Sequence, residues 1–475
     1  MSSANKIDAI LAAWKLTLAT RAADAAIFSP RGEVLRTFGD IGSEANTLAE
    51  KLARIPPGSV VAIQIGNSEH WPALLLACRL RALVPLPLGG HMGKAEREAV
   101  FAACGVAALV ELRDGGLTIS EFQSAPRAKP PAECDFLKLT SGTTAAPRAI
   151  RFRSGQLVAD CDNICETMGI GADDVNFGVI PFSHSYGFSS LLTPLLCRGV
   201  PLVASGDPLP HAILAGLTCS GATVFPGMPV FFQTFAGIEN IPALPRLRLC
   251  ISAGAPLAKN AAARFTEKFG LKIHVFYGSS ECGGICYDAS DFREYEEGFV
   301  GTAMRRVTIV PRDPSQPQQV EIRGAAVGDG YFPDPDSDSL GGGRFIPGDL
   351  VRKTGRGFFL AGRVSDVINI AGRKLNPAEV EAQLLKIPGV REAVVFGVPS
   401  PLRGEEPVAC VLASGVTREE LLALCREKLS AWQAPKDVWL VDAIPVNERG
   451  KISRRELSAR FLRLGDEELP VPPSR

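Results

Sequence analysis

One stretch, residues 137–150 (LKLTSGTTAAPRAI), constrains the fold of this chain more than any other. Its alternating leucines favour a short strand, which runs directly into small residues at 140–145 and then into Pro147 and Arg148. Small side chains let backbone N–H groups approach a ligand closely, while the hydroxyls and Arg148 add donors and positive charge. The stretch predicts a polyphosphate cradle. It is not a Walker A loop, because no G-x-x-x-x-G-K-[ST] pattern occurs, and an ordinary Ser/Thr/Gly surface turn is the alternative.

Length and charge narrow the class of protein. The 475 residues are too many for one compact core, so we expect two or three domains. A composition of 46% hydrophobic and 21% charged residues is typical of a globular protein. Lys plus Arg equals Asp plus Glu at 51 each, so no global field favours nucleic acid. The most apolar segment, 71–88, is interrupted by arginines and prolines, so we expect no membrane span.

The cysteines and the N-terminal segment bear on the compartment. The chain has twelve cysteines, and its first 28 residues show helical spacing of apolar side chains rather than the pattern of a signal peptide. We therefore expect free thiols and a cytoplasmic protein. Two pairs, Cys161 with Cys165 and Cys282 with Cys286, have i,i+4 spacing. No second Cys pair lies nearby in the sequence, so buried apolar cysteines are expected rather than a zinc site.

Helical and strand periods alternate in the first quarter of the chain, which predicts an α/β layer with a mostly parallel sheet. The expected elements are helices at 43–54, from residue 69, and at 94–104, with strands at 60–65 and 106–111. Between 298 and 359 the pattern changes to short strands and turns, which predicts a β-rich subdomain.

Helix starts are clear in the last third of the chain. Asn376, Pro377 and Glu379 provide an N-cap, an N1 proline and an N3 acid, and Thr417 with Glu420 forms a capping box. With strands at 393–398, 408–412 and 438–441, this part reads as a small α+β domain. The predicted fold is α/β overall, with a large N-terminal domain of mixed α/β sheets at residues 1–362 and a small C-terminal domain at 363–475.

Three polar or aromatic residues lie where strands end. His184 follows a strand at 175–180, a usual place for ligand contacts in an α/β sheet, although a structural histidine is the alternative. Tyr277 could lie flat against a purine, and Glu281 could hold Mg²⁺ between phosphates. The corresponding alternatives are a core tyrosine and a solvated glutamate.

Seven motifs in order resemble the adenylate-forming (AMP-binding) superfamily, which comprises acyl- and aryl-CoA synthetases, adenylation domains of peptide synthetases, and luciferases. They are TSGTTAAPR, PFSHSYGF, SAGAP, YGSSE, PGDL, GRVSDVINIAGRKLNPAEVE and PVNERGKISRREL, and they span roughly residues 40 to 460.

The resemblance implies roles position by position. ATP-binding residues would be Thr140, Ser141, Gly142, Thr143, Thr144, Gly254, Ala255, Tyr277, Gly278, Ser279, Ser280, Asp349 and Arg363. Catalytic residues would be Lys451, His184 and Arg148, and Glu281 would bind the metal. Gly372, Arg373 and Lys374 would line the thiol tunnel, and Tyr186, Phe188 and Gly283 the acyl pocket.

The implied reaction uses ATP, Mg²⁺ and a carboxylic acid, which would form an acyl adenylate and release pyrophosphate. A thiol would then displace AMP, and the small domain would rotate between these half-reactions. CoA and a fatty or aryl acid are the leading substrates. The phosphopantetheine of a separate acyl carrier protein is the alternative acceptor, and a non-catalytic nucleotide-binding relative is the alternative from another class.

Three positions depart from the family pattern. Ala145 stands where glycine is common, Arg148 where lysine is usual, and Ser365 at the hinge, where Asp or Lys is typical. Arginine keeps the positive charge and offers bidentate donors, so we expect activity to survive. Its larger head group changes the geometry.

Overall fold

The computed structural model describes residues 8–90, 92–122, 129–140, 147–311, 317–446 and 452–464. The chain divides into two compact units. The first comprises Met1–Pro311, Val320–Pro347 and Lys353–Phe359, and the second comprises Arg312–Gln319, Gly348–Arg352 and Leu360–Arg475. The fold is α/β, as expected from the sequence.

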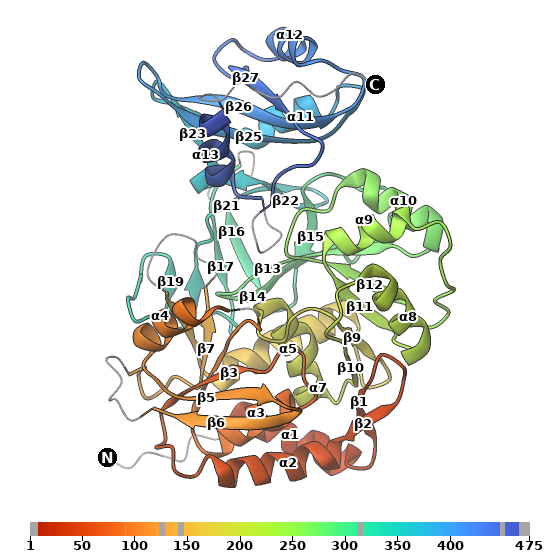
Figure 1. The fold of residues 1–475 in the computed structure, drawn as a ribbon, viewed down its shortest axis with the longest axis vertical. Helices are drawn as coiled ribbons and strands as arrows, with labels where there is room; N and C mark the ends of the chain where they lie inside the picture. Colours follow the sequence, from red (N-terminus) through yellow and green to blue (C-terminus); the bar gives the residue numbers. More distant parts are fainter. Residues whose placement is uncertain are drawn as a thin grey trace. The chain divides into compact units, whose positions relative to one another are not determined.

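The main sheet of the first unit has a parallel part and an antiparallel part (Figure 1). Its strands, in spatial order, are β2 (Val34–Thr37), β1 (Ala25–Phe28), β10 (Leu202–Ala204), β9 (Asn176–Gly178), β11 (Val224–Gly227), β12 (Leu249–Ser252), β13 (Ile273–Ser279), β14 (Gly283–Tyr287), β15 (Phe299–Ala303), β22 (Gly357–Arg363) and β21 (Asp349–Thr354). The pairings from β1 to β13 are parallel, whereas β13 to β22 pair antiparallel. Strands β21 and β22 each contribute residues to both units.

Smaller sheets complete the first unit. One has the order β4 (Val84–Pro87), β3 (Val60–Gln64), β5 (Val106–Arg113) and β6 (Gly116–Glu121). A second has the order β18 (Gly330–Phe332), β8 (Ala149–Phe152) and β7 (Phe136–Leu139). A third has the order β16 (Thr308–Pro311), β17 (Val320–Arg323), β20 (Arg344–Phe345) and β19 (Leu340–Gly341).

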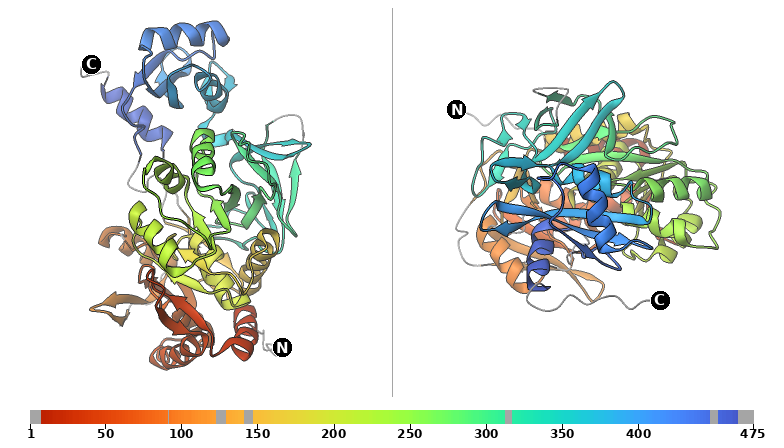
Figure 2. Two further views of the ribbon diagram at one scale, coloured as in Figure 1. Left: turned by 90° about the vertical axis from the view of Figure 1, so that its right-hand side faces the viewer. Right: turned by 90° about the horizontal axis from the view of Figure 1, so that it is seen from above.

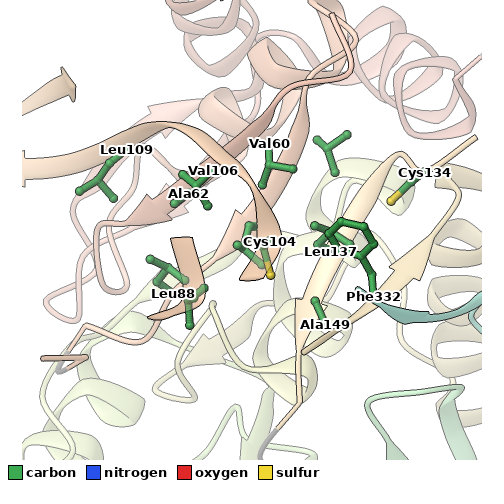
Figure 3. Close-up of a cluster of buried hydrophobic side chains, with 13 residues drawn as sticks. Val60, Ala62, Leu88, Cys104, Val106, Leu109, Cys134, Leu137, Ala149 and Phe332 are labelled. Carbon is green, nitrogen blue, oxygen red and sulfur yellow. The ribbon is translucent and has the colours of Figure 1, made fainter. Parts of the chain in front are cut away.

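A hydrophobic cluster joins the first two of these smaller sheets (Figure 3). Val60 of β3 and Val106 of β5 are buried in this cluster. Leu137 of β7, Ala149 of β8 and Phe332 of β18 belong to the same cluster. Burying a valine, leucine or phenylalanine side chain contributes ~1.5 to 3 kcal/mol. The cluster therefore fixes β7 and β8, the two strands that flank the predicted phosphate cradle.

Helices pack against the sheets of the first unit; Figure 1 shows α8, α9 and α10 beside strands β11 to β13. The helical segments are α1 (Ala9–Arg21), α2 (Phe38–Lys51), α3 (Trp71–Leu80), α4 (Lys94–Cys104), α5 (Ser154–Met168), α6 (Ser185–Gly187), the π-helix η1 (Phe188–Leu192), α7 (Thr193–Arg198), α8 (Pro210–Ser220), α9 (Pro229–Gly237) and α10 (Lys259–Phe269).

The second unit is a sheet with helices on both faces, and its blue ribbon can be followed in Figure 2. Its elements are the 3₁₀ turn η2 (Val364–Asp366), β23 (Ile368–Ile370), β24 (Arg373–Leu375), α11 (Pro377–Leu384), β25 (Val390–Ser400), β26 (Gly404–Ala413), α12 (Arg418–Lys428), β27 (Asp437–Leu440) and α13 (Arg454–Leu464). Val395 of β25 packs with α11 and α12, whereas its neighbours Val394 and Phe396 pack with Leu457 of α13. Alternate strand residues thus serve two cores.

Several predicted elements are confirmed, and several of their boundaries are wrong. The parallel pairing of β3 with β4 and β5, the caps at Asn376 and Thr417, and the β-rich stretch after residue 298 are all present. Helix α2 begins at Phe38 rather than at residue 43, because Thr37 and Asp40 form a capping box there. Strand β9 ends at Gly178, so His184 lies beyond the strand end.

Candidate active site

The predicted phosphate cradle begins and ends on an antiparallel strand pair. Leu139 of β7 lies opposite Ala149 of β8, and the backbone N–H and side-chain hydroxyl of Thr140 both donate to the Arg148 carbonyl at 3.1 Å. These bonds close the base of the segment and fix Arg148 beside Thr140. The predicted ligands Ser141, Gly142, Thr143 and Thr144, and the departure Ala145, lie outside the described residues.

Glu281 is held by two hydroxyl groups. Tyr331 donates to Glu281 Oε1 at 3.1 Å, and Ser279 donates to Oε2. The guanidinium carbon of Arg148 lies 4.1 Å from the centroid of the Tyr331 ring, a cation–π contact. Burial raises the pKa of Tyr331, and the charge of Glu281 adds to the rise, so the phenol carries its proton at neutral pH and donates it. The structure therefore links Arg148 to Glu281 through one aromatic ring.

The His184 motif is tied to the Glu281 loop. Ser185 donates to Ser280 Oγ at 2.7 Å, directly beside Glu281 in the chain. His184 is exposed and is the N-cap residue of α6, where its Nδ1 accepts from the Tyr186 N–H at 3.2 Å. His184 is thus at the surface, and its catalytic role remains a prediction.

The predicted adenine contacts lie at the ends of β12 and β13. Gly254 and Ala255 are exposed directly after β12, and Gly254 has φ +89°, a conformation that favours glycine. Tyr277 lies within β13, is 9% exposed and is paired with Cys286 of β14. Gly278, next to it, is exposed. The ring of Tyr277 is thus largely buried, and its stacking on adenine remains a prediction.

The three predicted acyl-pocket residues have different surroundings. The Tyr186 hydroxyl donates to the Ile251 carbonyl at 3.3 Å, and its ring lies 5.8 Å from that of Phe276. Phe188 packs in the interior at 4.5 Å from the Phe136 ring centroid. A side chain at Gly283 would clash with Asp160, since an added Cβ would lie 2.0 Å from its carboxylate. That these three residues line one acyl pocket remains a prediction.

Two predicted ribose ligands contact each other in the second unit. Arg363 Nε donates to Asp349 Oδ1 at 2.8 Å, so the two side chains are oriented by an ion pair. Arg363 is exposed, whereas Asp349 is partly covered, and its side chain is 16% exposed. A partly covered carboxylate with a fixed orientation suits the binding of two vicinal hydroxyls.

The predicted thiol-tunnel residues lie at the exposed turn that joins β23 to β24, with Gly372 in the turn and the other two at the start of β24. Gly372 has φ +84° and open space where a Cβ would lie, while Arg373 and Lys374 are exposed. Ser365 lies in η2, where its hydroxyl donates to Asp366 Oδ1 at 3.1 Å. Lys451 lies outside the described residues.

The donor set at Glu281 suits a hard cation. A carboxylate has about four lone-pair sites, so Glu281 retains acceptor capacity beside its two hydroxyl donors. Oxygen ligands with oriented hydrogen bonds are those that Mg²⁺ prefers. The residues therefore fit the ion, which would be held by Glu281 together with ligand phosphates. No cluster of three His, Cys, Asp or Glu side chains suited to a metal was found in the described part of the chain.

The cysteine prediction is confirmed for both pairs. Cys161, Cys165, Cys282 and Cys286 are buried free thiols, and burial raises the pKa of Cys286. Within the described ranges, the helices are too short or too polar to cross a membrane.

Tyr331 is a candidate site residue that no sequence pattern indicates. It lies in the turn-rich stretch after residue 298, and its partners Arg148 and Glu281 are distant in sequence. The only local signal is its place in the apolar pair Tyr331 and Phe332, which resembles an ordinary short strand.

Comparisons with known proteins bear on this geometry. The sequence profile of the AMP-binding enzyme matches residues 17–332, and that of the AMP-binding enzyme C-terminal domain matches residues 379–451. A feruloyl-CoA synthase from Amycolatopsis sp. is 26% identical, with 95% of this chain and 99% of the relative covered. A sulfoacetate–CoA ligase from Cupriavidus necator is also 26% identical, with 91% of this chain and 94% of the relative covered.

A solved structure agrees in fold. ATP-bound MatB from Rhodopseudomonas palustris superposes with a TM-score of 0.82 at 23% identity, covering 94% of this chain and 98% of MatB. The enzyme class expected from the sequence, an AMP-forming acid–thiol ligase, is confirmed at the level of the family. With two profiles that together match most of its length, the chain belongs to the family of AMP-binding enzymes.

Proposed function

We propose that the protein joins a carboxylic acid to CoA in two steps, through an acyl adenylate. What supports the proposal most is the contact chain from Arg148 through Tyr331 to Glu281, with Ser185 and Ser280 tying the His184 segment to the same loop. A cation, a carboxylate and an exposed imidazole thereby belong to one connected set of side chains.

In the first step, a carboxylate oxygen attacks the α-phosphorus of ATP, the bond to the β-phosphate oxygen breaks, and pyrophosphate leaves. The acid is ionised at neutral pH and acts as its own nucleophile, so the main barrier is repulsion between anions. Arg148 and Lys451 reduce this repulsion and position the phosphates. A Mg²⁺ ion held at Glu281 supplies further charge neutralisation when it is bound.

In the second step, a thiolate attacks the acyl carbon, the bond to the phosphate oxygen breaks, and AMP leaves. Gly372, Arg373 and Lys374 would contact the approaching thiol, since the exposed turn leaves room for a narrow chain. Asp349 and Arg363 would hold the ribose, and Gly254, Ala255 and Tyr277 the base. The boundary between the two catalytic domains is proposed near residue 362.

An aryl acid is the proposed substrate class, with a fatty acid second. The buried rings of Tyr186 and Phe276, 5.8 Å apart, give the predicted acyl-pocket residue Tyr186 an aromatic surrounding, which suits a planar ring. The likeness to a feruloyl-CoA synthase supports the same choice.

The test is pyrophosphate release from MgATP over a panel of aryl, fatty and amino acids, with and without CoA. We expect release with one acid class, faster turnover with CoA, and acyl-CoA among the products. Release that stays stoichiometric with CoA and turns over with a holo-carrier protein would move the acceptor to that carrier. ATP binding without release for any acid would contradict the proposal and favour the non-catalytic alternative.

Glu281→Gln serves as the site variant for this assay. Losing the carboxylate charge is expected to lower the rate by about 100-fold or more, because electrostatic stabilisation of the transition state is lost. Glu239→Gln, the same change at an exposed residue, is the matched control and should retain the wild-type rate.

A further inference from the structure

The strand register places Tyr331 on the side of β18 that faces away from the core. In β18, Tyr331 lies opposite Ile150 of β8, and Phe332 lies opposite Ala149. Successive residues of a strand point to opposite faces. Figure 3 shows Phe332 pointing into the hydrophobic cluster with Ala149. Tyr331 therefore points to the other face, and its contacts there include Arg148 and Glu281.

The hydroxyl of Tyr331 acts on the orientation of a carboxylate. Tyr331 is only 6% exposed, so water competes little for the 3.1 Å hydrogen bond from its hydroxyl to Glu281 Oε1. Ser279 donates to the other oxygen, so the two bonds together fix the carboxylate plane. Hydrogen bonds of this kind, to a carboxylate that binds a metal, set the direction of its free lone pairs.

The ring of Tyr331 acts on a cation. The Arg148 guanidinium carbon lies 4.1 Å from the ring centroid, and stacking on an aromatic face is a property of the planar guanidinium rather than of an ammonium group. The backbone adds a second attachment to the same loop, because the Gly328 N–H donates to the Glu281 carbonyl at 2.8 Å. The segment from Gly328 to Tyr331 is thus bound to Glu281 at both ends.

We propose that Tyr331 is a positioning residue with two separable effects, in which its hydroxyl orients Glu281 for a divalent cation and its ring holds Arg148 toward the nucleotide phosphates. The inference rests on the proposed function, because it takes MgATP as the ligand of these two residues. It also gives a reason for arginine at position 148, since a lysine there would lose the stacked geometry.

Calorimetric titration of ATP without any acid tests this, because nothing turns over. ATP affinity is measured over a range of Mg²⁺ concentrations for wild type, Tyr331→Phe and Tyr331→Leu. The phenylalanine keeps the ring, so ATP affinity without Mg²⁺ should be unchanged, while the Mg²⁺ concentration for half-maximal effect should rise about 10-fold or more. The leucine removes the ring as well, so affinity should fall with and without Mg²⁺.

Tyr295→Phe is the matched control. Tyr295 is also a buried tyrosine, and its hydroxyl bonds Thr266 and the Ile273 N–H, away from the site residues. Its variant should match wild type in both titrations. Wild-type Mg²⁺ dependence in Tyr331→Phe would overturn the inference alone. A wild-type protein whose ATP affinity ignores Mg²⁺ would overturn the inference and weaken the proposed function with it.

Discussion

Lys138 brings an ammonium group into the interior two residues before Thr140. The residue is 5% exposed, its Nζ donates to Ser189 Oγ at 3.3 Å, and it lies 4.8 Å from the centroid of the Phe152 ring. Burial lowers the pKa of Lys138, while the charge of Asp160 opposes the change most strongly, followed by Cys282 and Glu281. A buried charge with one hydroxyl partner among the described residues costs stability.

The cost should depend on pH. The pKa of Lys138 is lower in the folded chain than its ordinary value of 10.5. At a pH between the pKa of the folded chain and 10.5, the unfolded chain therefore binds more protons than the folded chain. Wild type should therefore gain unfolding free energy relative to Lys138→Met as pH rises toward 10.5. Urea denaturation from pH 7 to 10.5 in reducing buffer measures this difference. A difference that stays constant, or that changes in the other direction, would contradict the buried-charge account.

At the scale of secondary structure, local chemistry predicts helix ends better than strand partners. The caps at Asn376 and at Thr417 with Glu420 could be read from the sequence, because each acts within one helical turn. The pairing of β1 with β10 could not, because its partners are remote in the chain. Tyr331 was missed for the same reason, since its role depends on contacts with Arg148 and Glu281 that no local pattern records.

Arg454, the first residue of helix α13, ties the helix to three neighbouring elements. Arg454 donates to the Val395 carbonyl at 2.9 Å, to Asp366 at 2.6 Å and to Glu381 at 2.7 Å. It thus joins α13 to β25, α11 and the η2 turn that contains Ser365.

Arg454→Met should loosen this helix. Loss of these charged hydrogen bonds is expected to lower the free energy of unfolding of the second unit by about 2 kcal/mol. Hydrogen exchange at α13 should accelerate, while exchange in β9 to β13 of the first unit should not change. Arg455→Met, at the exposed neighbouring position, is the control and should exchange like wild type. Unchanged exchange at α13 in Arg454→Met would show that other contacts hold the helix.

At the scale of the whole molecule, the predicted site residues are divided between two units. Arg148, His184, Tyr277 and Glu281 belong to the first unit, whereas Asp349, Arg363 and the thiol-tunnel turn belong to the second. The order of the seven motifs along the chain predicts the family and its reaction type, because the seven together are far more specific than any one of them. The motifs do not identify the acid substrate or the thiol acceptor, because both depend on which side chains line a pocket. Packing between segments that are distant in the sequence decides which side chains these are.

Isotope exchange between pyrophosphate and ATP tests the central claim most directly, because it reports the reversible first step without any thiol. We expect exchange that requires Mg²⁺ and an acid of the class that supports pyrophosphate release, that proceeds without CoA, and that falls about 100-fold or more in Glu281→Gln. Exchange that is absent with every acid while ATP still binds, or that persists undiminished in Glu281→Gln, would contradict an adenylating site built around Arg148, Tyr331 and Glu281.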